Sequence, residues 1–350
     1  MTVFFNTLSR LSSLFLCVFL LLFAIVPAIG QDGQNDPVAA ESHDVEEDKF
    51  DAGKVIIHHV LDDHVWHFWD GHYGTLFLPV IVHSAERGWD AFSSRNFFDE
   101  HHKPVAYNGY TLEHNHVLLN GQPVFDLSIT KNVAMLLITA ALLVLVFLAV
   151  ASSYKRNQGK APRGLQSFIE PIILFVRDEV VKPNIGHGYE KYMPYLLTLF
   201  FFILFGNLLG LLPGAANLTG NIAVTFTLAV LTFIITNVSG NKNYWSHIFW
   251  TPGVPLPLRI VILPVEILGI FTKPISLMIR LFVAITAGHI VLLSLIALTF
   301  IFKSYGVGIA SSIVVLFINL IEILVAGIQA YVFTLFTSLY IGMARADDHH

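Results

Sequence analysis

The sequence contains a single cysteine and few charged residues for its length. Of 350 residues, one is cysteine and 13% are charged, whereas 55% are hydrophobic. One cysteine excludes an intramolecular disulfide and argues against a metal site built from thiolates. Several apolar runs exceed the roughly 18 residues that are needed to span a bilayer. These features indicate an integral membrane protein.

Basic residues are scarce in the one hydrophilic block of the chain. Residues 31–127 hold 17 of the 25 acidic residues, 11 of the 16 histidines and only 5 of the 20 basic residues. Because no basic face is concentrated in a hydrophilic region, a nucleic-acid-binding surface is excluded. Short β-like runs broken by Gly, Asn and Pro predict a small β-rich domain over about 52–127. The polar, acidic residues 31–50 are typical of a disordered segment.

The first 30 residues have the pattern of a secretory signal peptide. Arg10 is the basic flank, residues 14–26 form the apolar core, and "AIG" precedes Gln31. A retained anchor helix is the alternative interpretation. In both cases residues 31–127 would form an acidic, histidine-rich domain on the extracytoplasmic side.

The membrane part begins with a span predicted at residues 132–152. Four basic residues follow it directly and predict that this end is cytoplasmic. They are Lys155, Arg156, Lys160 and Arg163. Residues 165–182 are less apolar and are typical of an amphipathic helix that lies on the cytoplasmic surface.

Four further membrane elements are predicted at 194–212, 221–238, about 257–303 and about 307–343. A continuous helix of about 45 residues would be roughly 65–70 Å long, against about 30 Å of hydrocarbon. The last two helices should therefore be strongly inclined, or broken near Pro264 and Pro274. The expected fold is an all-α membrane protein with about five membrane elements and a small N-terminal extracytoplasmic domain.

Polar side chains interrupt these last two apolar segments. At 100° per residue they form stripes, with His289 on the opposite side of its helix from Arg280. The first stripe also contains Ala284 and Ala287, and the second contains Ala326 and Phe333. The polar set is Glu266, Lys273, Arg280, His289, Asn319, Glu322 and Gln329.

Arg280 is the most informative member of the set. Arginine keeps its proton under essentially all conditions, and in a bilayer centre it costs roughly 3 kcal/mol. Its helical neighbours include no carboxylate, so its partner should come from another helix or another protein. Ala284, Ala287 and Gly288 are small, which lets another backbone approach closely.

Simpler interpretations exist for the other members. Glu266 and Lys273 are seven residues apart and would suit a structural ion pair. Asn319 and Gln329 would suit interhelical hydrogen bonds. His289 could be a packing residue that forms a hydrogen bond within the protein.

Four segments within about 128–346 carry a family resemblance. They are "GNLLGLLPG", "PVEILGIFTKPISL", "LMIRLFVAITAGHI" and "ILVAGIQAYVFTLFTSLYIGMA". These segments resemble subunit a of F-type ATP synthases, and residues 347–350 form a tail outside the resemblance. The resemblance implies a non-catalytic proton-channel subunit of the F0 sector, without a cofactor. It also implies a cell inner membrane location and assembly with a c-subunit ring, the b subunits of the peripheral stalk and the rest of the complex.

The resemblance also assigns residues. Arg280 matches the essential arginine, Gln329 the glutamine that accompanies it, and Glu266 an acidic residue of the cytoplasmic exit. Many bacterial members have an acid at position 289 and a histidine at 322. Here the pair is exchanged, as in mitochondrial relatives, which suggests a cooperating proton relay.

Asn319 and Lys273 complete the expected proton-translocation residues, with protons as the coupling ion. Ala284 stands where bacterial members commonly have asparagine, which leaves the part played by that position open.

Two other classes of protein are weaker candidates. A secondary transporter or antiporter would be expected to show internal repeats, and the sequence shows none. An extracytoplasmic metal-binding protein is suggested by a group of histidines, but they lack a His-Glu-x-x-His spacing. Solvated acidic loops account better for these histidines. They are His58, His59, His64, His67 and His72.

Overall fold

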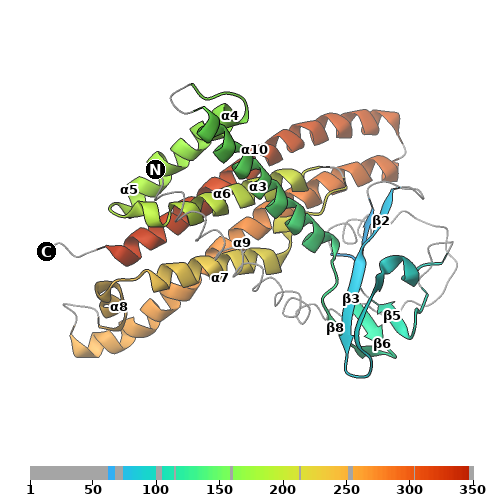
Figure 1. Ribbon diagram of the computed structural model, residues 1–350, viewed down its shortest axis with the longest axis horizontal. Coiled ribbons are helices and arrows are strands. Elements are labelled where there is room, and N and C mark those ends of the chain that lie inside the picture. Colours follow the sequence, from blue (N-terminus) through green and yellow to red (C-terminus); the bar gives the residue numbers. More distant parts are fainter. Residues whose placement is uncertain are drawn as a thin grey trace.

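The computed structural model shows a bundle of helices with a small strand domain at one end (Figure 1). The predicted signal peptide at 1–30, the acidic segment at 31–50 and the tail at 347–350 lie outside the residues that the structure describes. Those residues are 62–67, 74–99, 105–113, 116–157, 161–212, 214–250, 255–302 and 304–346.

The strand domain consists of three small antiparallel sheets. Alternation along the third strand buries Val80 and Val82 against Phe97, Tyr110 and other apolar side chains. The sheets have the orders β1-β2, β4-β3-β8 and β5-β6-β7. The described residues therefore confirm a β-rich region within 52–127. The strands are β1 (Val65–His67), β2 (Thr75–Phe77), β3 (Pro79–Ser84), β4 (Gly88–Ser93), β5 (Tyr110–Glu113), β6 (His116–Leu119), β7 (Gln122–Pro123) and β8 (Phe125–Asp126), with the 3-10 turn η1 (Ser94–Phe97).

Helices form the rest of the described chain. Four are long and apolar enough to cross a membrane, and α7 with α8, bent by 103°, makes up to five. This confirms the predicted number of membrane elements. The helices are α3 (Lys131–Arg156), α4 (Leu165–Phe175), α5 (Lys182–Ile185), α6 (Met193–Gly210), α7 (Ile222–Val238), α8 (Lys242–Phe249), α9 (Leu256–Phe302) and α10 (Tyr305–Arg345), with η2 (Val176–Val181), η3 (Tyr189–Lys191) and η4 (Leu218–Gly220) between them.

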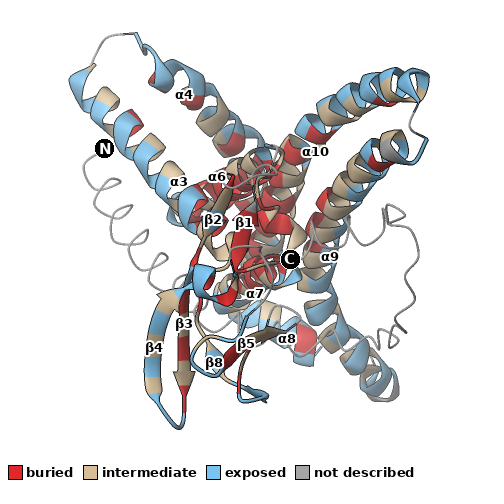
Figure 2. Ribbon diagram, turned by 90° about the vertical axis from the view of Figure 1, so that its right-hand side faces the viewer, coloured by how far each residue is buried: buried red, intermediate tan, exposed pale blue. Residues whose placement is uncertain are grey.

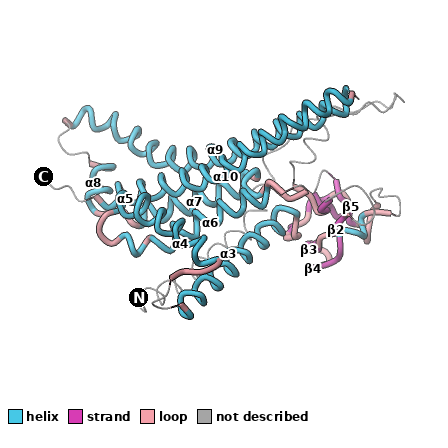
Figure 3. The backbone as a smooth tube through the Cα atoms, turned by 90° about the horizontal axis from the view of Figure 1, so that it is seen from above, coloured by secondary structure: helices cyan, strands magenta, loops and turns pink. Residues whose placement is uncertain are grey.

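The last two helices are continuous, so of the two predicted alternatives the structure has two long helices and not helices broken at prolines. Helix α9 runs through Pro264 and Pro274 without interruption over 47 residues. At 1.5 Å per residue it is about 70 Å long, so it must be strongly inclined to stay within a bilayer. Figure 3 shows the α9–α10 pair bowed along its length.

The segment predicted as an amphipathic helix at 165–182 is helical. It contains a π-helical stretch, η2, between α4 and α5. Ile169, Val176 and Val180 are buried, whereas Phe168 is 68% exposed. The segment therefore has one face against the bundle and another that leaves apolar side chains outside.

The centre of the bundle is formed around α6. Its side chains Leu196, Phe201 and Ile203 are almost completely buried. Helix α10 packs against α9 and α6, and α9 packs against α7. Figure 2 shows buried residues gathered at this centre, while the outer parts of α3, α4, α9 and α10 diverge and are exposed. Such exposed apolar arms suit lipid or neighbouring subunits.

The strand domain is fixed to the start of α3 by buried polar groups. The Asp62 carboxylate accepts hydrogen bonds from Thr130 Oγ1 at 2.7 Å and from the Asn132 backbone N–H at 3.1 Å. His64 Nε2 lies 3.2 Å from Asp126 Oδ2, and both side chains are buried. The Asp62 bonds satisfy donors at the helix N-terminus, where backbone N–H groups have no intrahelical partner, and the His64–Asp126 pair joins β8 to the residue before β1.

The Asp126 carboxyl group makes this attachment sensitive to pH. Burial alone would raise its pKa, but hydrogen bonds from His64 and Ser128 more than offset this and lower the pKa below its ordinary value of 3.8. Ionised Asp126 therefore stabilises the fold above pH 3.8, and this contribution is lost as the pH falls through the lower folded-state pKa.

We predict that Asp126→Ala lowers the free energy of unfolding near neutral pH by about 1–3 kcal/mol, because His64 loses its acceptor. The measurement is the urea midpoint of the purified chain in detergent. Glu86→Ala, which removes an exposed carboxylate from the β3–β4 turn, is the control. The difference from wild type should shrink at pH values below 3.8, and an equal loss at both pH values would contradict this account.

Candidate functional site

The candidate site is the seam where α9 packs against α10. Arg280 is half-buried near the middle of α9, and its Cζ lies 4.4 Å from the centroid of the Phe336 ring on α10. Its Nη1 atom is buried without a hydrogen-bond partner among the described residues. Within the described part of the chain, no carboxylate forms an ion pair with this guanidinium. The cation is therefore supported by an aromatic face and is not neutralised by a carboxylate of the described residues.

A second cation repeats this arrangement along the seam. Lys273 Nζ lies 5.5 Å from the centroid of the Tyr340 ring. Lys273 precedes Arg280 by seven residues, and Tyr340 follows Phe336 by four, so the antiparallel helices present two cation–ring pairs in register. Two positive charges are thus held on one side of α10.

Glu322 lies further along the seam, against a glycine of α9. Its side chain is 8% exposed, and its Oε2 atom is buried without a hydrogen-bond partner among the described residues. A Cβ atom at Gly288 would lie 2.5 Å from Glu322 Oε1. The absence of a side chain at Gly288 therefore provides the space for this carboxylate. His289 is the next residue in the sequence.

The three small residues after Arg280 have different surroundings within the described chain, and the prediction that another backbone approaches them stays a prediction. Gly288 receives the carboxylate of Glu322, whereas Ala287 is exposed and Ala284 is half-buried. The helical wheel gives the direction of each side chain, but it does not show which residue of the neighbouring helix faces it.

Asn207 of α6 belongs to the same region and was not among the predicted residues. Its Oδ1 accepts a hydrogen bond from Thr219 Oγ1 at 2.6 Å, and its Nδ2 donates to the Ala326 carbonyl at 3.4 Å. Ala326 lies one helical turn after Glu322. The sequence feature that could have identified Asn207 is that it is a single amide side chain within the apolar run "FFILFGNLLG".

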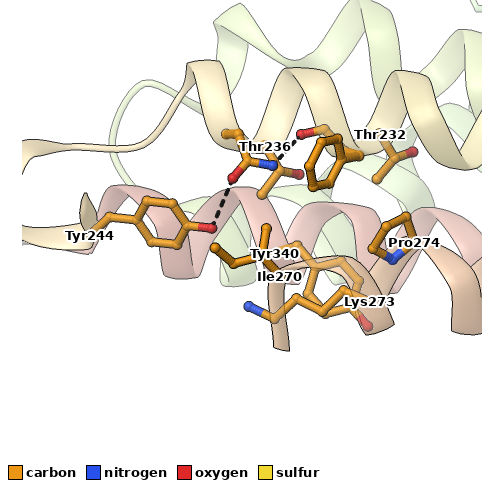
Figure 4. Close-up of a pocket in the computed structure, with 9 residues that line it drawn as sticks. Thr232, Thr236, Tyr244, Ile270, Lys273, Pro274 and Tyr340 are labelled. Carbon is orange, nitrogen blue, oxygen red and sulfur yellow. Dashed lines mark hydrogen bonds between the residues drawn. The ribbon is translucent and has the colours of Figure 1, made fainter. Parts of the chain in front are cut away.

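A polar pocket lies at the opposite end of the seam, among α7, α8, α9 and α10 (Figure 4). Its cavity volume is about 10 Å³, which is room for about one water molecule. Tyr244 donates a hydrogen bond to Asn237 Oδ1 at 3.2 Å, and Asn237 donates to the Phe233 carbonyl at 2.7 Å. The polar residues that line it are Thr232, Thr236, Asn237, Tyr244, Lys273 and Tyr340.

Glu266 lies near this pocket but does not line it. It is half-buried and interacts electrostatically with Lys273 and Tyr244. Within the described residues it forms no contact ion pair with Lys273, so the structural ion-pair interpretation gains no support. The carboxylate of Glu266 can therefore interact with groups in the pocket region.

Asn319 and Gln329 are both half-buried on α10. Gln329 lies seven residues from Glu322 and seven from Phe336, so these three side chains share one face of the helix. No side-chain hydrogen bond of Asn319 or Gln329 to another described residue is present, so nothing in this part of the chain supports a role as interhelical hydrogen-bonding residues.

The metal-binding alternative finds no site among the residues that the structure describes. They contain no group of three or more His, Cys, Asp or Glu side chains that could hold a metal ion. His64 is paired with Asp126. His58, His59 and His72 lie outside the described residues.

The fold and the seam define a class of protein: a multi-pass membrane protein whose buried polar chemistry is concentrated between its last two helices. Residues 133–342 match the family model described as ATP synthase A chain, and residues 55–132 match one described as a domain of unknown function, DUF8433. The chain belongs to the ATP synthase A chain family, which comprises subunit a of F-type ATP synthases.

Individual relatives agree with this assignment. The chain is 42% identical over 306 residues to ATP synthase subunit a of Chlorobium phaeobacteroides (strain DSM 266), covering 85% of this chain and 77% of that relative. It is 42% identical over 320 residues to the subunit from Pelodictyon phaeoclathratiforme, covering 89% and 81%. It is 51% identical over 234 residues to subunit a 2 of Chlorobaculum tepidum, covering 65% and 66%.

We predict that Gly288→Ala impairs proton movement because the new methyl group displaces the Glu322 carboxylate. ATP-driven proton pumping by the assembled complex in membrane vesicles should fall by up to about 100-fold, the loss that a misplacement of about 1 Å can cause at a reacting group. Gly269→Ala is the matched control on the same helix, since no atom lies within 4 Å of its Cβ position. Equal pumping by the two variants would contradict the placement of Glu322.

Proposed function

We propose that the chain is the proton-translocating stator subunit of the F0 sector, with two half-channels separated by Arg280 and facing a ring of c subunits. The observation that carries this proposal is a cation that has no carboxylate partner in the described part of the chain and lies between two polar regions. The partners are the carboxyl-bearing c ring, the b subunits of the peripheral stalk and the remainder of the complex.

The outer half-channel would contain Glu322, His289, Asn207 and Gln329. Gly288 follows Arg280 by eight residues, about 12 Å along the helix toward the strand domain. A carboxylate and an imidazole can both accept and release protons, and imidazole titrates near neutral pH. A proton entering here would neutralise a ring carboxylate, which could then face lipid without the cost of a buried charge.

The inner half-channel would be the polar pocket near Lys273, with Glu266 at its exit. Lys273 precedes Arg280 by seven residues, about 10 Å along α9 in the opposite direction. The pocket is the polar space described at this end of the seam. A ring carboxyl group that has nearly completed a turn would release its proton here.

Arg280 would act on the ring carboxyl group as it passes between these regions. Its fixed charge favours the ionised carboxylate and therefore lowers that carboxyl group's pKa. Stacking on Phe336 uses a face of the guanidinium, while its N–H donors lie in the plane and can meet a carboxylate. The positive charge also repels protons, so it prevents a direct leak between the half-channels.

The energy released when a proton crosses the membrane potential explains why such a barrier is needed. Each elementary charge that crosses 100 mV releases about 2.3 kcal/mol. A leak would discard this energy, whereas passage by way of the ring converts it into rotation. ATP formation then takes place elsewhere in the assembly, and this subunit is not itself the catalyst.

The charge distribution supports an orientation with the strand domain outside the cytoplasm. Lys155 and Arg156 end α3, whose opposite end joins the strand domain. Lys242 and Arg345 lie at the ends of α8 and α10 that are far from that domain (Figure 1). Basic residues near membrane helices are typical of the cytoplasmic side. This charge distribution supports a cytoplasmic C-terminus in a cell whose inner membrane holds the complex.

We predict that Arg280→Ala abolishes both coupled ATP synthesis and ATP-driven proton pumping, because the ring carboxylate loses its electrostatic partner. Arg280→Lys should also lose most activity, since an ammonium cannot reproduce the planar donor set. Arg259→Ala is the control, because Arg259 stacks on Trp250 at the start of the same helix, outside the seam. Normal ATP-driven pumping by Arg280→Ala would defeat the assignment.

We also predict that exchanging the relay pair is tolerated better than losing one member. The double variant His289→Glu with Glu322→His retains both chemistries, so its synthesis rate should exceed that of His289→Ala and of Glu322→Ala. Rates are measured per assembled complex in membrane vesicles. If the exchanged variant is as inactive as the two single losses, the pair does not act as a relay.

A further inference from the structure

The strand domain and the helices share part of one hydrophobic core. Trp66 of β1 is 5% exposed and Leu78, just after β2, is 6% exposed, and both belong to the apolar cluster of the helical bundle. The remaining core of the strand domain, with Val80 and Phe97 among its members, is a separate cluster. The first sheet is therefore packed as part of the membrane body.

Trp66 makes a direct polar contact with the connection between α6 and α7. Its Nε1 donates a hydrogen bond to the Gly214 carbonyl at 2.6 Å. A buried indole N–H normally has such a partner, and the contact joins residues that lie 148 positions apart in the chain. The outer domain thus holds the backbone of a loop between two membrane helices.

That loop continues inward to the wall of the proposed outer half-channel. Leu218 and Thr219 are fully buried, and a Cβ atom at Gly206 would lie 3.1 Å from Leu218. Thr219 donates to Asn207, which donates to the Ala326 carbonyl one turn from Glu322. A tightly packed and hydrogen-bonded path therefore runs from the outer domain to the Glu322 region.

The other side of the first sheet is anchored independently. The backbone N–H of Lys131 donates to the Asp63 carbonyl at 2.9 Å, next to the Asp62 bonds to Thr130 and Asn132. Trp66 lies three residues after Asp63 in the sequence. Because α3 fixes this strand, the indole has a fixed position from which to hold Gly214.

We propose that the outer domain positions the mouth of the outer half-channel, and that Trp66 is the positioning residue through its bond to Gly214. This inference rests on the proposed function of the Glu322 region. Without the bond, the α6–α7 connection can shift, the Thr219–Asn207 contact loosens, and proton entry from the outer side becomes less favourable. The turnover at saturating outer protons does not depend on this bond.

The test uses the complete ATP synthase in proteoliposomes, with ATP synthesis measured against the pH of the outer compartment at constant driving force. Trp66→Phe keeps an aromatic ring but removes the Nε1–H. We expect the outer proton concentration that gives the half-maximal rate to rise about threefold to tenfold, which corresponds to the loss of one hydrogen bond. The maximal rate should be unchanged. Trp89→Phe is the matched control, because Trp89 is 61% exposed on β4 of the same domain.

A second pair of variants tests the inner end of the path. Thr219→Val keeps the shape of the side chain but removes the hydroxyl donor to Asn207, so it should shift the pH profile in the same direction. Thr219→Ser retains the hydroxyl and should restore the wild-type profile. All rates are expressed per assembled complex, so a lower yield of complex does not enter the comparison.

Identical pH profiles for Trp66→Phe and Trp89→Phe would overturn the inference, as would a lower thermal stability of Trp66→Phe with an unchanged profile. Failure of this inference is distinct from failure of the proposed function. In the first case Arg280→Ala still abolishes coupling in the same proteoliposomes, and in the second it does not.

Discussion

A permanent positive charge that no carboxylate of the described residues neutralises is the constraint on which the rest of this structure depends. Placing an arginine in a bilayer costs roughly 3 kcal/mol on insertion scales. Stacking on an aromatic ring returns about 0.5–2 kcal/mol, so Phe336 offsets only part of that cost. The remainder must be met by water in the adjoining polar regions or by a carboxylate from another subunit. Glu322 does not supply it, because it lies against Gly288, two helical turns away from Arg280.

The two long helices make it possible to keep polar regions apart on one seam. Along α9 the order is Glu266, Lys273, Arg280 and then Gly288 with His289. By the rise of 1.5 Å per residue, the 23 residues from Glu266 to His289 extend over about 35 Å along α9. The strong inclination of this helix, about 70 Å long, keeps these groups closer to the bilayer centre than a steep helix would. The polar pocket and the Glu322 region can therefore face opposite sides of the membrane with the cation between them.

Much of this arrangement could be predicted from the sequence, because apolar length and helical periodicity are local properties. Five membrane elements, the β-rich domain and the stripes on the last two helices follow from them. What could not be predicted depends on the register between neighbouring elements. The helical wheel placed Gly288 beside the stripe that contains Arg280. It did not show that the Glu322 carboxylate occupies the space that a side chain at position 288 would fill.

Two other features depend on long-range packing. The buried bonds of Asn207 and the bond from Trp66 to Gly214 join segments far apart in the chain, and no local pattern marks such contacts. Prolines at 264 and 274 suggested a broken helix, yet α9 is continuous through both. A proline removes one backbone donor but does not by itself end a long helix within a membrane bundle.

The most direct measurement is a density map of the complete complex at a resolution that places side chains around Arg280. The account predicts that its guanidinium stacks on Phe336 and turns its N–H donors toward a carboxyl group carried by a ring subunit. A map in which a carboxylate of the same chain neutralises Arg280, with the guanidinium directed away from the ring, would contradict it.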